Sequence, residues 1–252
     1  CKHFVQSALQ TLAGKCVRQV YVFSENMAQQ CAGIGLHNVE RVQPGVDPEQ
    51  FCPVNDTRRQ VLKQQYGMPL EQSILLGLGR LVENKGYHLA LAALAHLPHV
   101  HLIIVGEGEC LSALQAQVST LGLAEQVTLL GASQTPQHFY QLADVFMFTS
   151  TYEPFGQTLL EASCCAVPVV SFRPSSDVVT ATPYVLGEEN VFWAADTEAH
   201  TLAETLNTAL NTPERASELA QLAQAHVIKH YSWASLAYRL HPWETDSQER
   251  GE

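Results

Sequence analysis

Basic residues are scarce in this chain of 252 residues and are missing from a long central stretch. The sequence holds 14 lysines and arginines against 25 aspartates and glutamates, which gives a formal net charge of −11. A surface of that sign repels phosphate backbones and anionic lipids. We therefore exclude DNA, RNA or an anionic membrane as a partner for the whole surface. Between Gly86 and Phe172 there is no lysine or arginine.

Long apolar runs are also lacking. No segment approaches the roughly 20 apolar residues of a membrane-spanning helix. The sequence opens CKHFVQSALQ, without an initiator Met or the basic start and apolar core of a signal peptide. We expect a soluble, cytoplasmic protein. We also expect the chain to be a piece of a longer one, or else a processed or an incomplete chain. The seven cysteines are odd in number and form no CxxC pair, so reduced thiols fit better than a disulfide framework.

Metal-ligand spacing is absent as well. His96, His99 and His101 span a predicted loop that enters a strand, and His226 and His230 stand one helical turn apart. Neither group has a neighbouring cysteine or an HExxH glutamate. We predict solvated or loop histidines and no metal site.

What the sequence does contain is an alternation of short apolar runs with segments of helical spacing, from Ser73 onward. Near-continuous apolar strands separated by helices are typical of a parallel sheet that is covered on both faces. The pattern predicts an α/β fold with a doubly wound parallel sheet. The predicted strands are 74–79, 101–106, 127–131, 145–150, 167–172 and 190–195, and the predicted helices between the first five are 86–97, 110–123, 135–143 and 158–166.

Both ends of the chain differ from this pattern. A helix over 3–13 and strands over 20–24 and 39–43 precede a sharp PGVD turn, and two strands cannot form an independent sheet. We expect residues 1–47 to be the tail of a preceding domain. Residues 48–72 would then be a linker and helix, 73–231 the main domain, and 232–252 a helix that packs back toward the first segment, followed by a polar tail.

Two basic residues follow the first strand of the main domain. Parallel sheets bind ligands at the carboxyl ends of their strands. Arg80 can place a forked pair of hydrogen bonds on a phosphate, and Lys85 can add a point charge beside it. Lys85 and Gly86 also open a helix, whose N-terminal amides favour anions. Their position at the border of the stretch without basic residues predicts an anion site.

Two glutamates bracket a Pro-Phe-Gly turn after the strand 145–150. Glu153 lies in the loop, and Glu161 lies about one turn into the following helix. The amides of Phe155, Gly156 and Gln157 stand at the predicted start of that helix. Because a carboxylate repels phosphate, the glutamates need neutral, hydroxyl-bearing partners. A diphosphate with one sugar on each side satisfies the basic and acidic side chains together.

At these residues the sequence resembles the retaining glycosyltransferases of family 4, also called glycosyl transferases group 1, which have the GT-B fold. GRLVENKG is similar to the Arg-x4-Lys signature of the family, and ADVFMFTSTYEPFGQTLLEA to its strand and Glu-x7-Glu signature. PGVDPEQFCP is similar to the interdomain linker, and PERASELAQLAQAHVIKHYSW to the C-terminal helices. The resemblance covers nearly the whole chain from about Val20. It implies the Rossmann-like C-terminal half of a GT-B fold, with a remnant of the N-terminal domain before it.

The resemblance implies a function and a role for each residue along the sheet edge. The function is transfer of a sugar from a nucleotide-diphosphate sugar to an unidentified sugar, polysaccharide or lipid-linked acceptor, with retention at the anomeric carbon. No cofactor or metal is implied, and the sequence has no Asp-x-Asp motif. Any peripheral contact with the inner face of a membrane would fall to the N-terminal domain. Arg80 and Lys85 would hold the diphosphate, and Glu153 would hold the transferred sugar together with the amides of Phe155, Gly156 and Gln157. Glu161 would bind the ribose, and Gly131 and Ala132 would lie against the base. The residues expected to be catalytic are Glu153, Arg80 and Lys85.

The sequence departs from the family pattern at three places. Ala166 stands where the family commonly has glycine after the Glu-x7-Glu helix. RPSSDVV replaces a glycine-rich loop, where Arg173, Ser175 and Ser176 are candidate donors to the leaving phosphate. Most of the N-terminal domain is not in the sequence, so we expect the chain alone to bind nucleotide sugar without transferring it.

Other functions of the same fold were weighed against the same residues. A GT-B phosphorylase needs a lysine for pyridoxal phosphate, and after Lys85 the only lysine is Lys229 in a predicted helix. GT-B nucleotide-sugar epimerases lack the Glu-x7-Glu signature, so Glu161 favours a transferase. A non-catalytic nucleotide-sugar-binding domain stays open as an alternative.

Overall fold

The computed structural model describes residues 19–240, which form two compact units. The larger unit spans residues 46–230. The smaller unit combines residues up to 45 with residues from 231 onward. The predicted helix over 3–13 and the polar tail lie outside the described residues.

A six-stranded parallel sheet forms the centre of the larger unit. All six predicted strands are present, which confirms the α/β parallel fold. Their neighbours in the sheet follow the order β10-β8-β6-β3-β4-β5. The strands are β3 (Ser73–Leu78), β4 (Val100–Val105), β5 (Val127–Leu130), β6 (Val145–Phe148), β8 (Val169–Phe172) and β10 (Phe192–Ala194).

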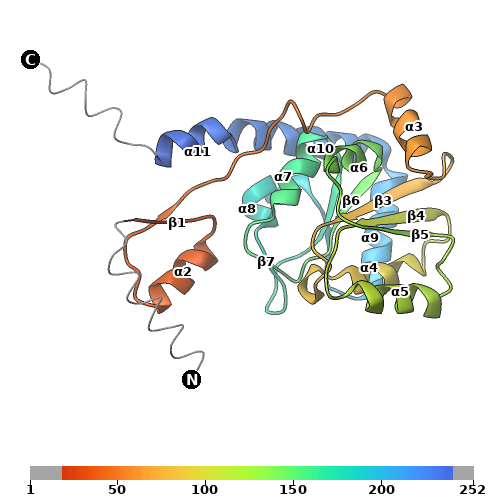
Figure 1. Ribbon diagram of the computed structural model, residues 1–252, viewed down its shortest axis with the longest axis horizontal. Coiled ribbons are helices and arrows are strands. Elements are labelled where there is room, and N and C mark those ends of the chain that lie inside the picture. The colour runs from red at the N-terminus through yellow and green to blue at the C-terminus, as the bar shows by residue number, and fades with distance from the viewer. Residues whose placement is uncertain (1–18, 241–252) are drawn as a thin grey trace, which may run out of the picture. The chain divides into compact units, whose positions relative to one another are not determined.

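Helices cover both faces of this sheet (Figure 1). The four helices predicted between the strands are all present. One face carries α4 (Tyr87–Leu94), α5 (Leu111–Thr120) and α9 (Ala199–Asn211). The opposite face carries α3 (Asp56–Gln65), α6 (Pro136–Leu142), α7 (Gln157–Cys164) and α10 (Pro213–His230). A short helix, α8 (Thr182–Leu186), precedes β10.

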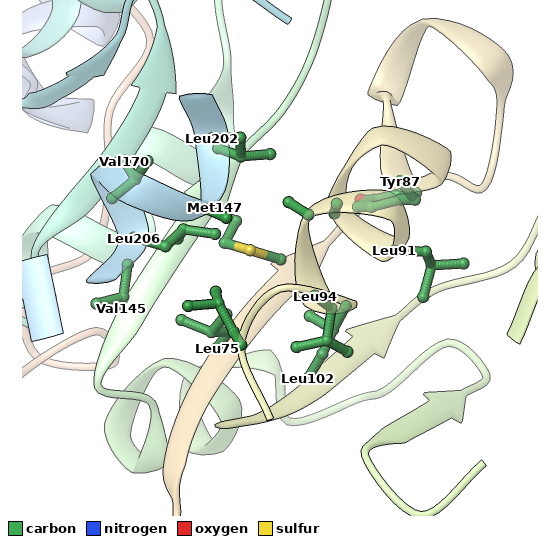
Figure 2. Close-up of a cluster of buried hydrophobic side chains, with 14 of the residues drawn as sticks. Leu75, Tyr87, Leu91, Leu94, Leu102, Val145, Met147, Val170, Leu202 and Leu206 are labelled. Carbon is green, nitrogen blue, oxygen red and sulfur yellow. The ribbon is translucent and has the colours of Figure 1, made fainter. Parts of the chain in front are cut away.

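The apolar core explains why the strands read as continuous hydrophobic runs. Figure 2 shows Leu75 of β3 and Met147 of β6 facing Leu94 of α4 and Leu206 of α9. Leu75, Leu94 and Leu206 are at most 1% exposed. A strand with helices on both faces must be apolar at every position, because neither face meets water.

The order of the strands defines a switch point. From β3 the chain builds the sheet outward through β4 to β5, then returns to the other side of β3 with β6 and continues to β10. Connections therefore diverge from the carboxyl ends of β3 and β6. Open α/β sheets bind ligands in the crevice at this point.

The smaller unit contains two short parallel strands, β1 (Val20–Val22) and β2 (Val39–Arg41), joined through α2 (Glu25–Gly33). The hydroxyl of Ser24 accepts a hydrogen bond from the Met27 amide and so caps α2. A last helix, α11 (Trp233–Leu240), belongs to the same unit. Its Arg239 donates to the carbonyl oxygen of Arg41 at 3.4 Å. No helix among residues 19–240 is both long enough and apolar enough to cross a bilayer.

Candidate functional site

The turn after β3 is packed against the end of β6. Residues 83–85 form a single 3₁₀ turn, and Gly86 follows in the left-handed region at φ 66°. A Cβ on Gly86 would lie 2.0 Å from the carbonyl oxygen of Thr149, so only glycine fits. The Thr149 hydroxyl donates in turn to the Lys85 carbonyl at 2.9 Å. Lys85 is thereby fixed at the switch point.

Two further hydrogen bonds fasten the same loops to each other. The Thr151 amide donates to the Asn84 carbonyl at 2.9 Å. The Asn84 side-chain amide donates to the Tyr152 carbonyl at 2.8 Å. The loops that carry the basic and acidic candidates therefore form one connected structure.

A two-residue strand positions Glu153. The strand β7 (Tyr152–Glu153) pairs in parallel with β9 (Val179–Thr180), which follows β8. The Val179 amide donates to the Thr151 carbonyl at 2.9 Å, and the Ala181 amide to the Glu153 carbonyl at 3.0 Å. Sequence analysis missed this pairing, because strands of two residues leave no periodicity to detect.

Lys85 and Glu153 meet directly. The Lys85 ammonium contacts one oxygen of the Glu153 carboxylate, and the two side chains are only 14% and 15% exposed. The roles expected from the sequence, a diphosphate contact for the lysine and a sugar contact for the glutamate, do not include this contact. The two groups neutralise each other in a setting that is largely screened from solvent.

A small pocket opens beside this pair. Tyr87 is 4% exposed, and burial together with the Glu153 charge raises its pKa, so its hydroxyl stays neutral and able to donate. The polar side chains that line the pocket are Lys85, Tyr87, Thr149, Ser150 and Thr158. A Cβ on Gly79 would approach the Tyr87 hydroxyl to 3.1 Å.

Arg80 lies on a backbone that the loop after β4 holds in place. The Leu81 amide donates to the Glu107 carbonyl at 2.8 Å, and the Cys110 amide donates to the Leu81 carbonyl at 2.9 Å. A Cβ on Gly108 would lie 2.2 Å from the Leu81 carbonyl oxygen. Arg80 itself is exposed, and no ion pair joins it to another residue in the described part of the chain.

Glu161 has a different environment. It lies in α7, which begins after Gly156 in the left-handed region at φ 85°. Its carboxylate accepts a hydrogen bond from the Tyr140 hydroxyl at 2.9 Å. Burial raises the pKa of Glu161 to about 6, and the bond from Tyr140 opposes that rise.

The loop after β5 brings the predicted base contact next to a carboxylate. The Ala132 amide donates to Glu107 Oε1 at 3.4 Å, and a Cβ on Gly131 would lie 3.5 Å from the same oxygen. The sequence alone gives Glu107 no role, because a single glutamate in a glycine-rich loop carries no further signal.

The remaining candidates lie around the start of α7 and after β8. Phe155 and Gln157 flank Gly156, which directly precedes the helix. The Ser175 hydroxyl accepts from the amides of Asp177 and Val178, both at 3.2 Å, and so closes a turn. The Arg173 guanidinium lies 5.5 Å from the centre of the Trp193 ring. Two of the three candidate phosphate donors, Arg173 and Ser175, therefore make contacts within their own region.

No group of three or more His, Cys, Asp or Glu side chains is arranged for a metal ion within residues 19–240. The prediction of a loop or solvated histidine is wrong for His101. This residue lies in β4, is 8% exposed, and its Nε2 is 2.8 Å from the Thr128 hydroxyl. A polar partner on the next strand lets a histidine occupy an otherwise apolar strand.

Comparison with known proteins assigns the chain to a family. The family described as Glycosyl transferases group 1 matches residues 58–226, and the chain belongs to it. A GDP-mannose-dependent alpha-(1-6)-phosphatidylinositol monomannoside mannosyltransferase of Mycolicibacterium smegmatis is 32% identical over 216 residues, which cover 80% of this chain and 55% of that protein. Mannosylfructose-phosphate synthase of Agrobacterium fabrum is 34% identical over 152 residues, covering 55% of this chain and 33% of the relative.

Solved structures share the fold. Anabaena HepE in complex with UDP-glucose superposes with a TM-score of 0.81 at 25% identity, over 91% of this chain and 64% of HepE. Sucrose-phosphate synthase from Thermosynechococcus elongatus gives a TM-score of 0.80 at 21% identity, over 97% of this chain and 62% of that one. The fold is thus that of GT-B glycosyltransferases. The chain spans less than two thirds of the length of each of these proteins.

Proposed function

We propose that this chain forms the donor-binding part of a retaining glycosyltransferase that uses a nucleotide-diphosphate sugar. The observation that carries the proposal is the meeting of the Arg80–Lys85 turn with the Glu153 loop at the switch point of the sheet. Family membership supports it. The GDP-mannose dependence printed for one relative and the UDP-glucose bound to HepE support a nucleotide sugar as the ligand.

The diphosphate would lie over the turn after β3. Arg80 offers an exposed guanidinium fork, and Lys85, five residues further along the same turn, offers an ammonium. When the bond between the sugar and the diphosphate breaks, negative charge grows on the departing phosphate oxygen. Cations that have been placed beside that oxygen by donor binding lower the barrier to bond cleavage.

Glu153 would hold the transferred sugar. Its carboxylate is the partner of Lys85, and an arriving diphosphate competes for the same ammonium. Once Lys85 turns to the phosphate, the Glu153 carboxylate can accept hydrogen bonds from sugar hydroxyls. The backbone bonds to β9 hold Glu153 in place during this exchange.

The nucleoside would extend toward β5 on the other side of the diphosphate. Glu161 would accept from the ribose hydroxyls, and Gly131 and Ala132 would lie against the base. The amides of Phe155, Gly156 and Gln157 would border the sugar. We further propose that residues 1–47 and 232–252 belong with an acceptor-side domain of the whole protein.

The test is a ligand screen by thermal shift against UDP-, GDP- and ADP-sugars. A specific ligand at 100 times its Kd stabilises the folded chain by about 2.7 kcal/mol. We expect one base to give that shift and the others to give much less. As a matched control, Arg215→Ala removes an exposed arginine on α10 that pairs with Glu218, and it should keep the full shift. Absence of a shift with every nucleotide sugar would contradict the proposal.

A further inference from the structure

The Glu161 carboxylate accepts a hydrogen bond from Tyr140, a residue that has no role in the proposed function. Tyr140 of α6 is 0% exposed, yet its hydroxyl reaches the edge of the site and donates to Glu161 Oε2 at 2.9 Å. Tyr140 Oη makes no other hydrogen bond within residues 19–240. The Glu161 carboxylate accepts no hydrogen bond from any other residue in this range. The second carboxylate oxygen, Oε1, is therefore available to a ligand.

Aromatic packing fixes the direction of the Tyr140 hydroxyl. The ring stands edge-on to Phe146 with centroids 5.4 Å apart, and edge-on to Phe51 at 6.0 Å. Phe51 is itself 8% exposed. Beside it, the Gln141 side-chain amide donates to the Cys52 carbonyl at 3.0 Å, which ties this segment to α6. A ring held on two sides cannot swing its hydroxyl away from Glu161.

We propose that Tyr140 is a positioning residue that orients the Glu161 carboxylate so that Oε1 accepts hydrogen bonds from the ribose hydroxyls of the donor nucleotide. The inference rests on the proposed function, because it requires a nucleotide in the site. It adds that recognition of the ribose depends on a residue buried between α6 and the segment before α3.

The electrostatic setting supports this arrangement. Burial disfavours the charged form of Glu161, and the Tyr140 hydroxyl is the hydrogen bond that favours it. The titratable groups beside this carboxylate are Tyr140 on α6, Cys164 at the end of α7 and Cys165 directly after it; Tyr87 acts in turn on Tyr140, Asp47 on Cys164, and Cys52 on Cys165. Burial raises the pKa of Tyr140, Cys164 and Cys165, so these three groups stay neutral near pH 7. Removal of the Tyr140 hydroxyl therefore raises the pKa of Glu161 further.

The experiment compares Tyr140→Phe with Tyr66→Phe by calorimetric titration of UDP, GDP and ADP near pH 7.5. Tyr66 also packs on α6, but its hydroxyl contacts Thr135 and His138. For the diphosphate that binds, the 2′,3′-dideoxy form is titrated as well. We expect Tyr140→Phe to weaken binding of the ribonucleotide about fivefold to tenfold, the scale of one ordinary net hydrogen bond. Tyr140→Phe should change the affinity for the dideoxy form by less than about twofold. Tyr66→Phe should leave both ligands unaffected.

A second readout needs no ligand. Carboxyl NMR titration of the chain with ¹³C-labelled glutamate should show a higher pKa for Glu161 in Tyr140→Phe than in the unchanged protein, and no change in Tyr66→Phe. An unmoved Glu161 titration would overturn the inference, and so would equal weakening of the ribo and dideoxy ligands. If the unchanged protein binds both forms equally well, the role of Tyr140 fails while nucleotide binding stands. If it binds none of UDP, GDP and ADP, the proposed function fails as well.

Discussion

Lys85 and Glu153 stand 68 positions apart in the chain, and their charged groups are in contact across the switch point between β3 and β6. A buried charge is stable only with a partner, and each of these two groups supplies it to the other. The pair therefore links the proposed diphosphate contact to the proposed sugar contact, and replacement of one residue changes the behaviour of the other.

Glu153→Gln should separate these two contacts. Loss of the carboxylate frees Lys85, so binding of the free nucleoside diphosphate should stay the same or become tighter by a few-fold. Binding of the nucleotide sugar should lose the extra affinity that the sugar contributes, because a neutral amide accepts sugar hydroxyls less strongly than a carboxylate. Calorimetric titration of both ligands measures the difference. Weaker binding of the free diphosphate would mean that Glu153 does not compete for Lys85.

Glu161→Gln should stabilise the chain while it weakens nucleotide binding. The pKa of Glu161 is raised from 4.5 to about 6 in the folded chain, so its contribution to stability is present below pH 4.5 and is lost as the pH rises through 6. At pH 7.5 the buried charge costs about 1–2 kcal/mol, at 1.36 kcal/mol per pKa unit. Glutamine avoids this cost and still accepts from Tyr140.

Denaturant unfolding at pH 4 and at pH 7.5 checks this prediction. Glu161→Gln should be more stable than the unchanged protein at pH 7.5 and nearly equal to it at pH 4. The same variant should weaken free nucleotide and nucleotide sugar by similar factors, because both carry the ribose. A stability difference that does not depend on pH would contradict the assignment of the raised pKa.

Gly86→Ala should lower the stability of the chain more than Gly67→Ala does. Both glycines are in the left-handed region, at φ 66° and φ 68°, so both substitutions carry the same backbone strain of about 1 kcal/mol. Only at Gly86 would the added Cβ clash, 2.0 Å from the Thr149 carbonyl oxygen, while Gly67 has open space. Thermal unfolding of the two variants gives the difference, which we expect to exceed about 1 kcal/mol. Equal losses would show that the close approach at Thr149 is unimportant.

Ala166→Gly should stabilise the chain. Ala166 follows the C-terminal end of α7 at φ 53° and is the single described non-glycine residue with a positive φ. The left-handed conformation costs an L-residue about 1–2 kcal/mol, and glycine avoids most of this. Because glycine also increases the entropy of the unfolded chain, we expect a net gain of about 0.5–1 kcal/mol. A melting temperature lower for Ala166→Gly than for the unchanged protein would contradict the claim that Ala166 is strained.

The sequence predicts the sheet well because its four inner strands, β8, β6, β3 and β4, are buried at nearly every position. Runs such as 101–106 are apolar at nearly every position, and this pattern survives without knowledge of the neighbours. The residues just after the strands could also be found, since parallel strands bring their carboxyl ends to one edge. Arg80, Lys85 and Glu153 were identified in this way.

Contacts between distant residues could not be predicted. The ion pair of Lys85 with Glu153 and the bond from Tyr140 to Glu161 depend on side-chain directions that only the packed structure fixes. The pairing of β7 with β9 escaped notice because two residues carry no pattern. The turn that Ser175 closes, in which its hydroxyl accepts from two backbone amides, could not be foreseen either, and it leaves the O–H of Ser175 able to donate.

The most direct measurement of the central claim is the affinity of Arg80→Ala and Lys85→Ala for the nucleoside diphosphate that the ligand screen selects. Each variant loses a charged hydrogen-bonding partner of the diphosphate, so calorimetric titration should show a loss of about 1.5–3 kcal/mol for each. Arg215→Ala should bind like the unchanged protein. Unchanged affinity in both Arg80→Ala and Lys85→Ala would contradict the claim that the turn after β3 holds the diphosphate.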